Sequence, residues 1–337
     1  MHLSKKYFMF IICSFFLLSS LQADIVRCAA LDIGSGETKL TIADVDTDLN
    51  KIIKIHYQDY TAVELREDLA ISHDGNLSKQ IETKLITVLN DYKNATVNLS
   101  PQQWFGIGTS VFRNAKNGRE FLDRIKTETG ISLYLAAQIE EGEIGFKSAV
   151  AASGLDANQI IAWDLGSGSF QITTMNGGEL AMYGAEFAFV SALEVLIKTI
   201  REQTFNPKLS PNPVNSEEIS LLSSVIQNEK LPAIPSWLSS GTKEVVSFGG
   251  YTSIFATGQL ATGKELYTRA EILEAIEKFA GKSDDQLSTF PEPREAVVGL
   301  ALLHAVMNHC GFNKMIYKRT NGSCEGLLII PQYWRNE

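Results

Sequence analysis

Apolar and polar residues alternate along this chain with periods that predict both strands and helices. Two apolar runs, ending at Ile33 and Leu165, are typical of buried strands, and each carries one aspartate just before a glycine turn. The resulting segments are nearly identical: Asp32-Ile33-Gly34-Ser35-Gly36 and Asp164-Leu165-Gly166-Ser167-Gly168. We therefore expect two similar α/β units that present matched loops to a shared cleft.

The elements around these loops recur in a similar order in both halves of the chain. The first half predicts strands at 39–45, 51–57, 104–109 and 131–136, and helices at 79–92, 118–129 and 140–153. The second half predicts strands at 160–164, 170–175, 180–187, 245–248 and 315–317, and helices at 191–201, 269–280 and 294–310. Capping boxes are expected at Asn117 with Glu120 and at Thr268 with Glu271.

A hairpin follows each glycine loop, and this order predicts mixed sheets. The Rossmann fold does not fit, because its glycine loop leads directly into a helix. With 337 residues, the chain exceeds the size at which a single core stops growing, so we expect two domains. We assign 24–155 to domain I and 156–318 to domain II. For the C-terminal segment, 319–337, a return to domain I is one option.

The first 23 residues are typical of a secretory signal peptide. Lys5 and Lys6 precede an apolar run at 7–18, and small residues lead to Ala23, where we expect cleavage. This predicts a periplasmic or secreted protein without a stable membrane span, although a retained N-terminal anchor is the alternative. The formal net charge of −9, which becomes more negative after cleavage, argues against binding to nucleic acid.

Three cysteines remain after that cleavage: Cys28, Cys310 and Cys324. In an exported chain, Cys310 and Cys324 could form a disulfide that closes a short C-terminal loop. Three buried thiols are an equal alternative, because free cysteine is commonly buried.

The two glycine loops have the composition of phosphate-binding loops. Glycine allows the backbone conformations in which successive N–H groups converge on an anion, and serine adds a hydroxyl donor. One such loop would be an ordinary turn, whereas two matched copies favour a site. The candidate phosphate-binding residues are Gly34, Ser35, Gly36, Gly166, Ser167, Gly168 and Ser169. Asp32 and Asp164 supply the oxygen ligands that Mg²⁺ prefers, so we expect them to hold this cofactor.

Two further segments carry candidate catalytic residues. Thr109 and Arg113 lie at a strand-to-helix corner, where free N–H groups and a guanidinium can bind phosphate. A surface arginine is the alternative there. Glu140 and Glu141 open the helix before the second loop, and one of them could activate a water for attack on phosphorus. The helix dipole is expected to keep that carboxylate ionised at neutral pH, although acidic residues are common in a first turn for this reason alone.

In this order along the chain, these segments resemble the exopolyphosphatase/guanosine pentaphosphate phosphohydrolase (Ppx/GppA) family of the actin-like ATPase superfamily. The resemblance extends to a glycine-rich loop at Gly249 and Gly250 and to the ending at 322–328. It implies an α/β fold of two ribonuclease H-like (actin-like ATPase) domains, with mixed sheets facing an interdomain cleft. It also implies that Glu141 is the catalytic base and that Gly249 and Gly250 bind phosphate.

As a function, the resemblance implies an exported, Mg²⁺-dependent hydrolase that releases phosphate from polyphosphate or a related phosphate chain. The expected partner is polyphosphate or a small phosphorylated or nucleotide ligand, and a homodimer is one option. Gly36, Glu37, Glu143 and Gln171 stand where the family has asparagine, a small polar residue, arginine and glutamate. These departures leave open a catalytically impaired binding protein. A phosphotransferase of the sugar- or acetate-kinase kind is a third interpretation, against which an exported location without ATP argues.

Overall fold

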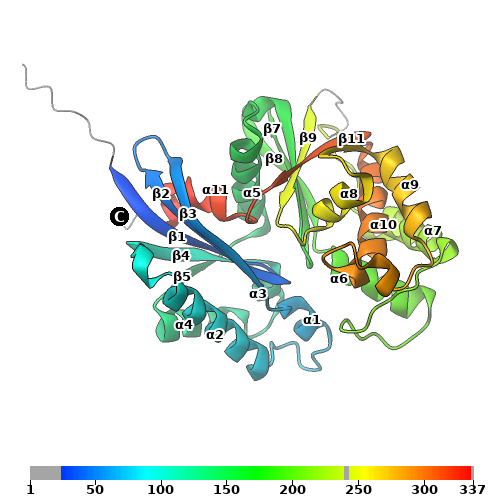
Figure 1. Ribbon diagram of the computed structural model, residues 1–337, viewed down its shortest axis with the longest axis horizontal. Coiled ribbons are helices and arrows are strands. Elements are labelled where there is room, and N and C mark those ends of the chain that lie inside the picture. The colour runs from blue at the N-terminus through cyan, green and yellow to red at the C-terminus, as the bar shows by residue number, and fades with distance from the viewer. Residues whose placement is uncertain (1–23, 239–242, 335–337) are drawn as a thin grey trace, which may run out of the picture.

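The computed structural model of the protein describes residues 24–238 and 243–334. Two mixed sheets, each covered by helices, lie side by side along the long axis of the molecule (Figure 1). The two-unit α/β architecture predicted from the repeated loops is therefore confirmed. The predicted signal peptide, 1–23, lies outside the described residues.

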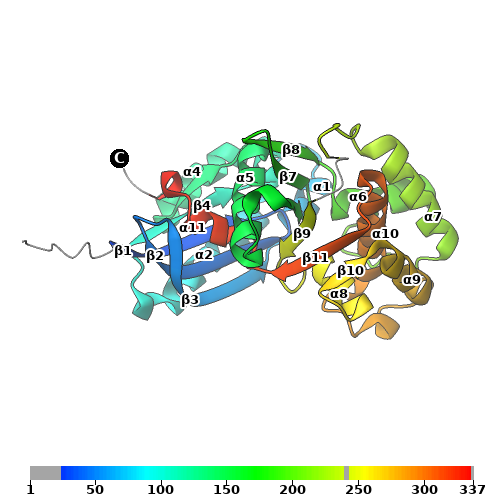
Figure 2. The same ribbon diagram turned by 90° about the horizontal axis from the view of Figure 1, so that it is seen from above.

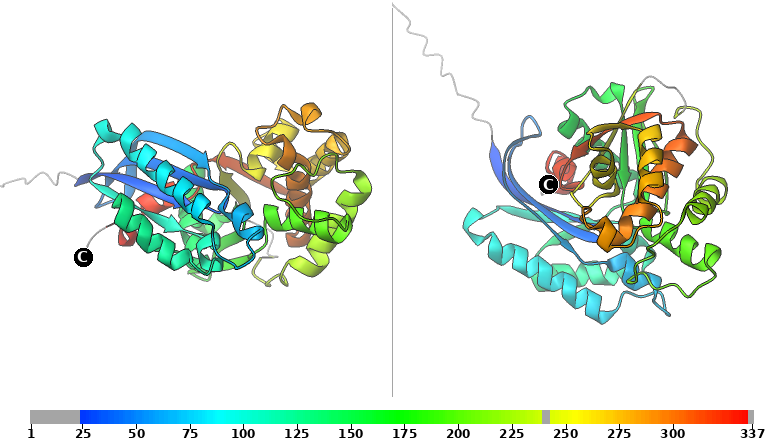
Figure 3. Two further views of the ribbon diagram at one scale, coloured as in Figure 1. Left: turned by 90° about the horizontal axis from the view of Figure 1, so that it is seen from below. Right: turned by 45° about the vertical axis from the view of Figure 1, so that its right-hand side comes forward.

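The first sheet has the strand order β3-β2-β1-β4-β5 in the described residues. Its members are β1 (Ile25–Ile33), β2 (Glu37–Asp46), β3 (Lys51–Ala62), β4 (Gln103–Gly108) and β5 (Ser132–Leu135). β1 is antiparallel to β2 and parallel to β4, so the first glycine loop lies at the tip of a hairpin. Helices α2 (Lys79–Ala95) and α4 (Gly118–Thr129) cover one face of this sheet (Figure 3).

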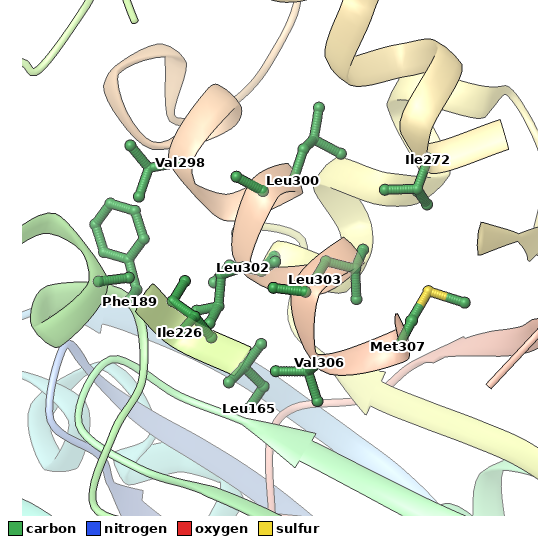
Figure 4. Packing of buried hydrophobic residues seen from close by; sticks show 14 of the residues in the cluster. Leu165, Phe189, Ile226, Ile272, Val298, Leu300, Leu302, Leu303, Val306 and Met307 are labelled. Carbon is green, nitrogen blue, oxygen red and sulfur yellow. The ribbon is translucent and has the colours of Figure 1, made fainter. Parts of the chain in front are cut away.

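The second sheet has the order β10-β11-β9-β6-β7-β8 in the described residues. Its members are β6 (Ile160–Leu165), β7 (Phe170–Asn176), β8 (Glu179–Ala185), β9 (Glu244–Gly249), β10 (Leu266–Thr268) and β11 (Lys314–Arg319). β6 pairs antiparallel with β7, so the second loop also lies in a hairpin. Leu302 and Val306 of helix α10 (Pro293–Cys310) belong to the same apolar cluster as Leu165 (Figure 4). This cluster supports the strand that carries the second loop.

Two helices connect the units. α5 (Gln138–Ser153) places Ile144 in the core of the first sheet and Phe146 in the core of the second. After β11 the chain crosses to the first sheet, where α11 (Cys324–Leu328) packs against α5 and β1 (Figure 2). The other helices are α1 (Leu65–Ala70), α3 (Ser110–Asn114), α6 (Phe189–Glu194), α7 (Ser216–Val225), α8 (Ile254–Thr262) and α9 (Arg269–Phe279).

Several local expectations differ from the structure. The helix expected at 191–201 starts earlier, as α6, and continues as a π-helix over Val195–Ile200. Asn117 precedes α4 but its side chain makes no cap; its Oδ1 instead accepts from the N–H of Leu77, because the chain before α2 passes beside it. The capping box of Thr268 and Glu271 is confirmed. No expectation covered α7 or α8, which are short, with 10 and 9 residues.

The disulfide option is wrong. Cys28, Cys310 and Cys324 are all free and buried, and Cys310 and Cys324 lie in helices that pack in different units. Burial raises the pKa of the Cys310 thiol to about 12, as expected for an unreactive buried group. Among the described residues, no helix has both the length and the apolar character to cross a membrane.

Candidate active site

The two glycine loops form the same turn. The N–H of Gly34 donates to the carbonyl of Glu37 over 2.9 Å, and the N–H of Gly166 donates to the carbonyl of Ser169 over 3.0 Å. Each hydrogen bond closes the hairpin three residues after the first glycine. The repeated sequence thus becomes a repeated backbone conformation in two different sheets.

The loops also touch across the interface between the units. A Cβ atom on Gly168 would lie 2.7 Å from Ser35 Oγ and 3.0 Å from Ser110 Oγ, and a Cβ on Gly36 would collide with Ser167 Oγ. Each loop therefore requires a glycine where the serine of the other loop approaches. Serine hydroxyls from both units therefore lie close together at this point, where they can donate to an anion.

A cleft of about 180 Å³ opens beside the touching loops. Most of the predicted phosphate- and metal-binding residues line it, namely Asp32, Gly34, Ser35, Gly36, Asp164, Gly166, Ser167, Gly249 and Gly250. Thr109, Arg113, Glu141, Gly168 and Ser169 are not among its lining residues. Thr109 instead donates its hydroxyl to the carbonyl of Ile33 over 3.3 Å, so it holds the end of β1 in place.

Lys39 is a cleft residue that the sequence interpretation missed. Asp32 and Lys39 face each other in the β1–β2 pairing, so the register of the hairpin was a signal that could have found it. Burial would lower the pKa of the Lys39 ammonium, but the carboxylates of Asp32 and Glu37 raise it above its ordinary value. A lysine that stays charged among these carboxylates is available to bind phosphate.

Asp32 and Asp164 face the same cleft. Burial and then the charge of Asp32 raise the pKa of Asp164 to about 7. Asp32 accepts a hydrogen bond from the N–H of Ser323 over 3.0 Å, so the C-terminal segment orients it. Within the described residues, no cluster of three or more His, Cys, Asp or Glu side chains forms a closed metal cage. Two carboxylates that face one cleft fit Mg²⁺, which is usually bound through one or two carboxylates plus substrate oxygens and water.

Glu141 lies in the first turn of α5 and is held by Arg113. Arg113 Nη1 donates to Glu141 Oε2 over 2.7 Å and to the carbonyl of Ala136 over 2.9 Å. The same guanidinium donates from Nη2 to Glu186 Oε1 over 2.6 Å. Glu186, which follows β8, was not found from the sequence; nothing in the local pattern distinguishes it from an exposed acid. The arginine expected to bind phosphate is thus engaged by two carboxylates.

Glu141 differs from expectation in its ionisation. Burial raises the pKa of Glu141 to about 8, against the lowering effect of Arg113, and the charges of Asp164 and Asp32 raise it further. The expectation that the helix dipole keeps this carboxylate ionised at neutral pH is therefore wrong. Loss of solvation outweighs the dipole because the side chain is only about one tenth exposed.

Comparison with known proteins places this architecture in a family. The family model described as the Ppx/GppA phosphatase family matches residues 29–329. The chain belongs to the Ppx/GppA phosphatase family. Exopolyphosphatase 1 of Mycobacterium leprae is 25% identical over 153 residues, which cover 44% of this chain and 42% of that protein. The match thus spans less than half of the length of that curated relative.

Two further similarities cover more of the chain. Exopolyphosphatase 2 of Mycobacterium tuberculosis is 22% identical over 277 residues, 78% of this chain and 82% of that protein. The crystal structure of the Aquifex aeolicus Ppx/GppA family member has a TM-score of 0.67 and 20% identity, and the match covers 90% of this chain and 97% of that one. This likeness confirms the two-domain, actin-like fold.

The residues that depart from the Ppx/GppA pattern occupy different places. Glu37 lines the cleft, where it accepts a hydrogen bond from the Thr252 hydroxyl and lies 3.6 Å from the Lys39 ammonium. Glu143 lies near Tyr333, whose pKa it helps to raise, and does not line the cleft. Gln171 is buried and donates to Ser169 Oγ over 3.1 Å. Of the four departures, Gly36 and Glu37 line the cleft, and Glu37 is the one that adds a charge there.

Proposed function

We propose that this protein hydrolyses phosphoanhydride bonds of polyphosphate or a related phosphate chain. The observation that carries the proposal is the position of Glu141, which α5 holds in a buried site where it interacts electrostatically with Asp32 and Asp164 of the cleft. A pKa of about 8 makes Glu141 a stronger base, once deprotonated, than an ordinary carboxylate. Family membership supports the same reaction class.

The residues have separate tasks in this reaction. The N–H groups and serine hydroxyls of the two loops bind the oxygens of the transferred phosphoryl group. Glu141 orients a water and accepts its proton at the carboxylate, while Arg113 fixes the direction of that carboxylate. Lys39 offsets negative charge beside Asp32 and Asp164. We also propose that Asp32 and Asp164 hold Mg²⁺, which would neutralise charge on the phosphate oxygens.

The charge of the cleft favours a short anionic segment over a long one. Its described lining has seven acidic and three basic side chains. A long polyphosphate needs a basic channel, whereas a terminal segment can be held by backbone N–H groups, Lys39 and a bound cation. The substrate that fits best is therefore the end of a phosphate chain.

Phosphate release from polyphosphate by the purified protein with Mg²⁺ tests this proposal. Glu141→Gln should lower the rate by ~10²- to 10⁴-fold, because it removes the base but keeps the size of the side chain. Glu140→Gln is the matched control. Glu140 accepts from the N–H of Ala137 over 2.7 Å and thus caps α5, a role that glutamine can retain. Equal phosphate release by Glu141→Gln and the wild-type protein would disprove the assignment.

A non-catalytic phosphate-binding protein is the second candidate. The observation that favours it is that Arg113 donates to Glu141 from Nη1 and to Glu186 from Nη2. Both terminal nitrogens of this guanidinium are therefore already bound to carboxylates and not to a substrate. It predicts calorimetric binding of tripolyphosphate with no phosphate release at any pH between 6 and 9. Release that depends on Glu141 rules this candidate out.

We further propose export through cleavage after Ala23, on the basis of the N-terminal sequence. Mass spectrometry of the protein from its native cells should find a mature chain that begins at Asp24 in the periplasmic or secreted fraction. A full-length chain in the membrane fraction would indicate the retained anchor instead.

A further inference from the structure

Arg66, in α1, is a cleft cation that has no partner among the described residues. The basic side chains that line the cleft in the described part of the protein are Lys39, Arg66 and Arg294. Lys39 lies 3.6 Å from Glu37, and Arg294 donates to Glu67 over 2.6 Å. The Arg66 side chain has neither an ion pair nor a hydrogen bond to any described residue, and its Nε atom is buried without an acceptor.

The backbone around Arg66 is tied to the first phosphate loop. The N–H of Arg66 donates to the carbonyl of Ser35 over 2.8 Å, and the N–H groups of Val63 and Glu64 both donate to the carbonyl of Gly36 over 2.9 Å. The backbone of Arg66 is therefore fixed relative to the loop. Arg66 also lines the same cleft as the residues of this loop.

The chain just before Arg66 has a costly backbone conformation at a residue that lines the cleft. Glu64, which precedes α1, has φ of 47°, a left-handed conformation that is unfavourable for a residue with a Cβ. Such conformations concentrate at ligand-binding sites, where the surrounding structure maintains them. The neighbouring acids are engaged elsewhere: Glu64 pairs with Lys84 over 2.6 Å, and Glu67 pairs with Arg294. Arg66 alone among these neighbours keeps its donors for another group.

An unpaired guanidinium with a buried nitrogen carries a desolvation cost that a phosphate would remove. Arginine is especially suited to this task because its planar donors match two phosphate oxygens. We propose that Arg66 binds the third phosphate group of the chain, counted from the one held by the two loops, and so makes the site select longer phosphate chains over pyrophosphate, which lacks that group. This inference rests on the proposed function, since it names the part of that substrate which Arg66 contacts.

The test compares Arg66→Gln with the wild-type protein on pyrophosphate and tripolyphosphate. Loss of a charge-assisted hydrogen bond should raise KM for tripolyphosphate by ~10- to 100-fold, with a much smaller change for pyrophosphate. Arg66→Lys keeps the charge but not the two-oxygen geometry and should fall between the two. Arg119→Gln, on the exposed face of α4, is the matched control and should not change either KM.

Calorimetric titration separates this inference from the proposed reaction. Glu141→Gln and the double variant with Arg66→Gln are titrated with tripolyphosphate and with pyrophosphate, and the thermal melting of each variant is recorded. A weaker affinity of the folded double variant for tripolyphosphate supports the inference even when the wild-type protein hydrolyses nothing. Equal affinities with and without Arg66, or an equal loss for both ligands, would overturn it.

Discussion

Arg113 and Glu141 form an ion pair in which Nη1 lies 2.7 Å from Oε2, and the same guanidinium binds Glu186 of the second unit over 2.6 Å. The proposed base is thus held by a cation that it shares with a carboxylate across the interface. The ionisation of Glu141 consequently depends on how closely the two units pack. This contact connects the arrangement of the domains to the chemistry of the site.

The rate of hydrolysis should rise with pH through the pKa of Glu141. Burial raises that pKa to about 8, so most of the carboxyl is protonated at pH 7 and cannot accept a proton from water. We expect kcat/KM to increase between pH 7 and 9 and then to level off. Because Asp164 and Asp32 interact with Glu141, the midpoint belongs to the group of carboxylates. A profile that is flat from pH 6 to 9 would contradict Glu141 as the base.

Glu186→Gln should move that pH profile to lower pH. With Glu186 neutral, Arg113 has one charged partner left and favours the ionised form of Glu141 more strongly. We expect the midpoint to fall by ~0.5 to 1 pH unit, as measured by initial rates across the pH range. The control is Glu143→Gln, a neighbour of Tyr333 outside the cleft. An unchanged midpoint in Glu186→Gln would show that the shared arginine does not couple the two carboxylates.

Gly168→Ala should impair the site far more than Gly166→Ala. A Cβ at Gly168 would lie 2.7 Å from Ser35 Oγ. A Cβ at Gly166 would lie 3.7 Å from the carbonyl oxygen of Ser169, which is an ordinary van der Waals contact. The first change forces the loops apart, and a displacement near 1 Å can cost ~10²-fold in rate. Phosphate release measures the effect, and thermal melting checks that both variants fold. Similar rates for the two variants would mean that the loops need not touch during turnover.

Glu37→Gln should improve phosphate binding. The Glu37 carboxylate lines the cleft and lies beside Lys39, so its removal reduces repulsion and leaves the ammonium to the substrate. We expect KM for tripolyphosphate to fall by ~3- to 10-fold at low ionic strength, with a smaller effect in high salt. A higher KM would instead indicate that Glu37 acts through its hydrogen bond from Thr252.

Sequence periodicity predicted most of the strands and the long helices, because each of these elements buries one face and its pattern is local. It also predicted both loops, since an aspartate and a Gly-Ser-Gly turn are contiguous in the chain. The pattern failed where contacts over long sequence distances decide the structure. The side chain of Asn117 accepts a hydrogen bond from the N–H of Leu77 instead of capping α4. Helix α6 continues as a π-helix, which no local pattern indicated.

The sequence by itself determined the repeated units, the loop glycines and the carboxylates Asp32 and Asp164, because these are properties of short segments. The choice of Glu141 over Glu140 came from the family resemblance. The tertiary structure alone decided which charges meet. It placed Lys39 among carboxylates, engaged Arg113 with Glu186 and, within the described part of the chain, left Arg66 without a partner. It also raised the pKa of Glu141, because burial depends on packing from both units and no local pattern records how much solvent a side chain loses.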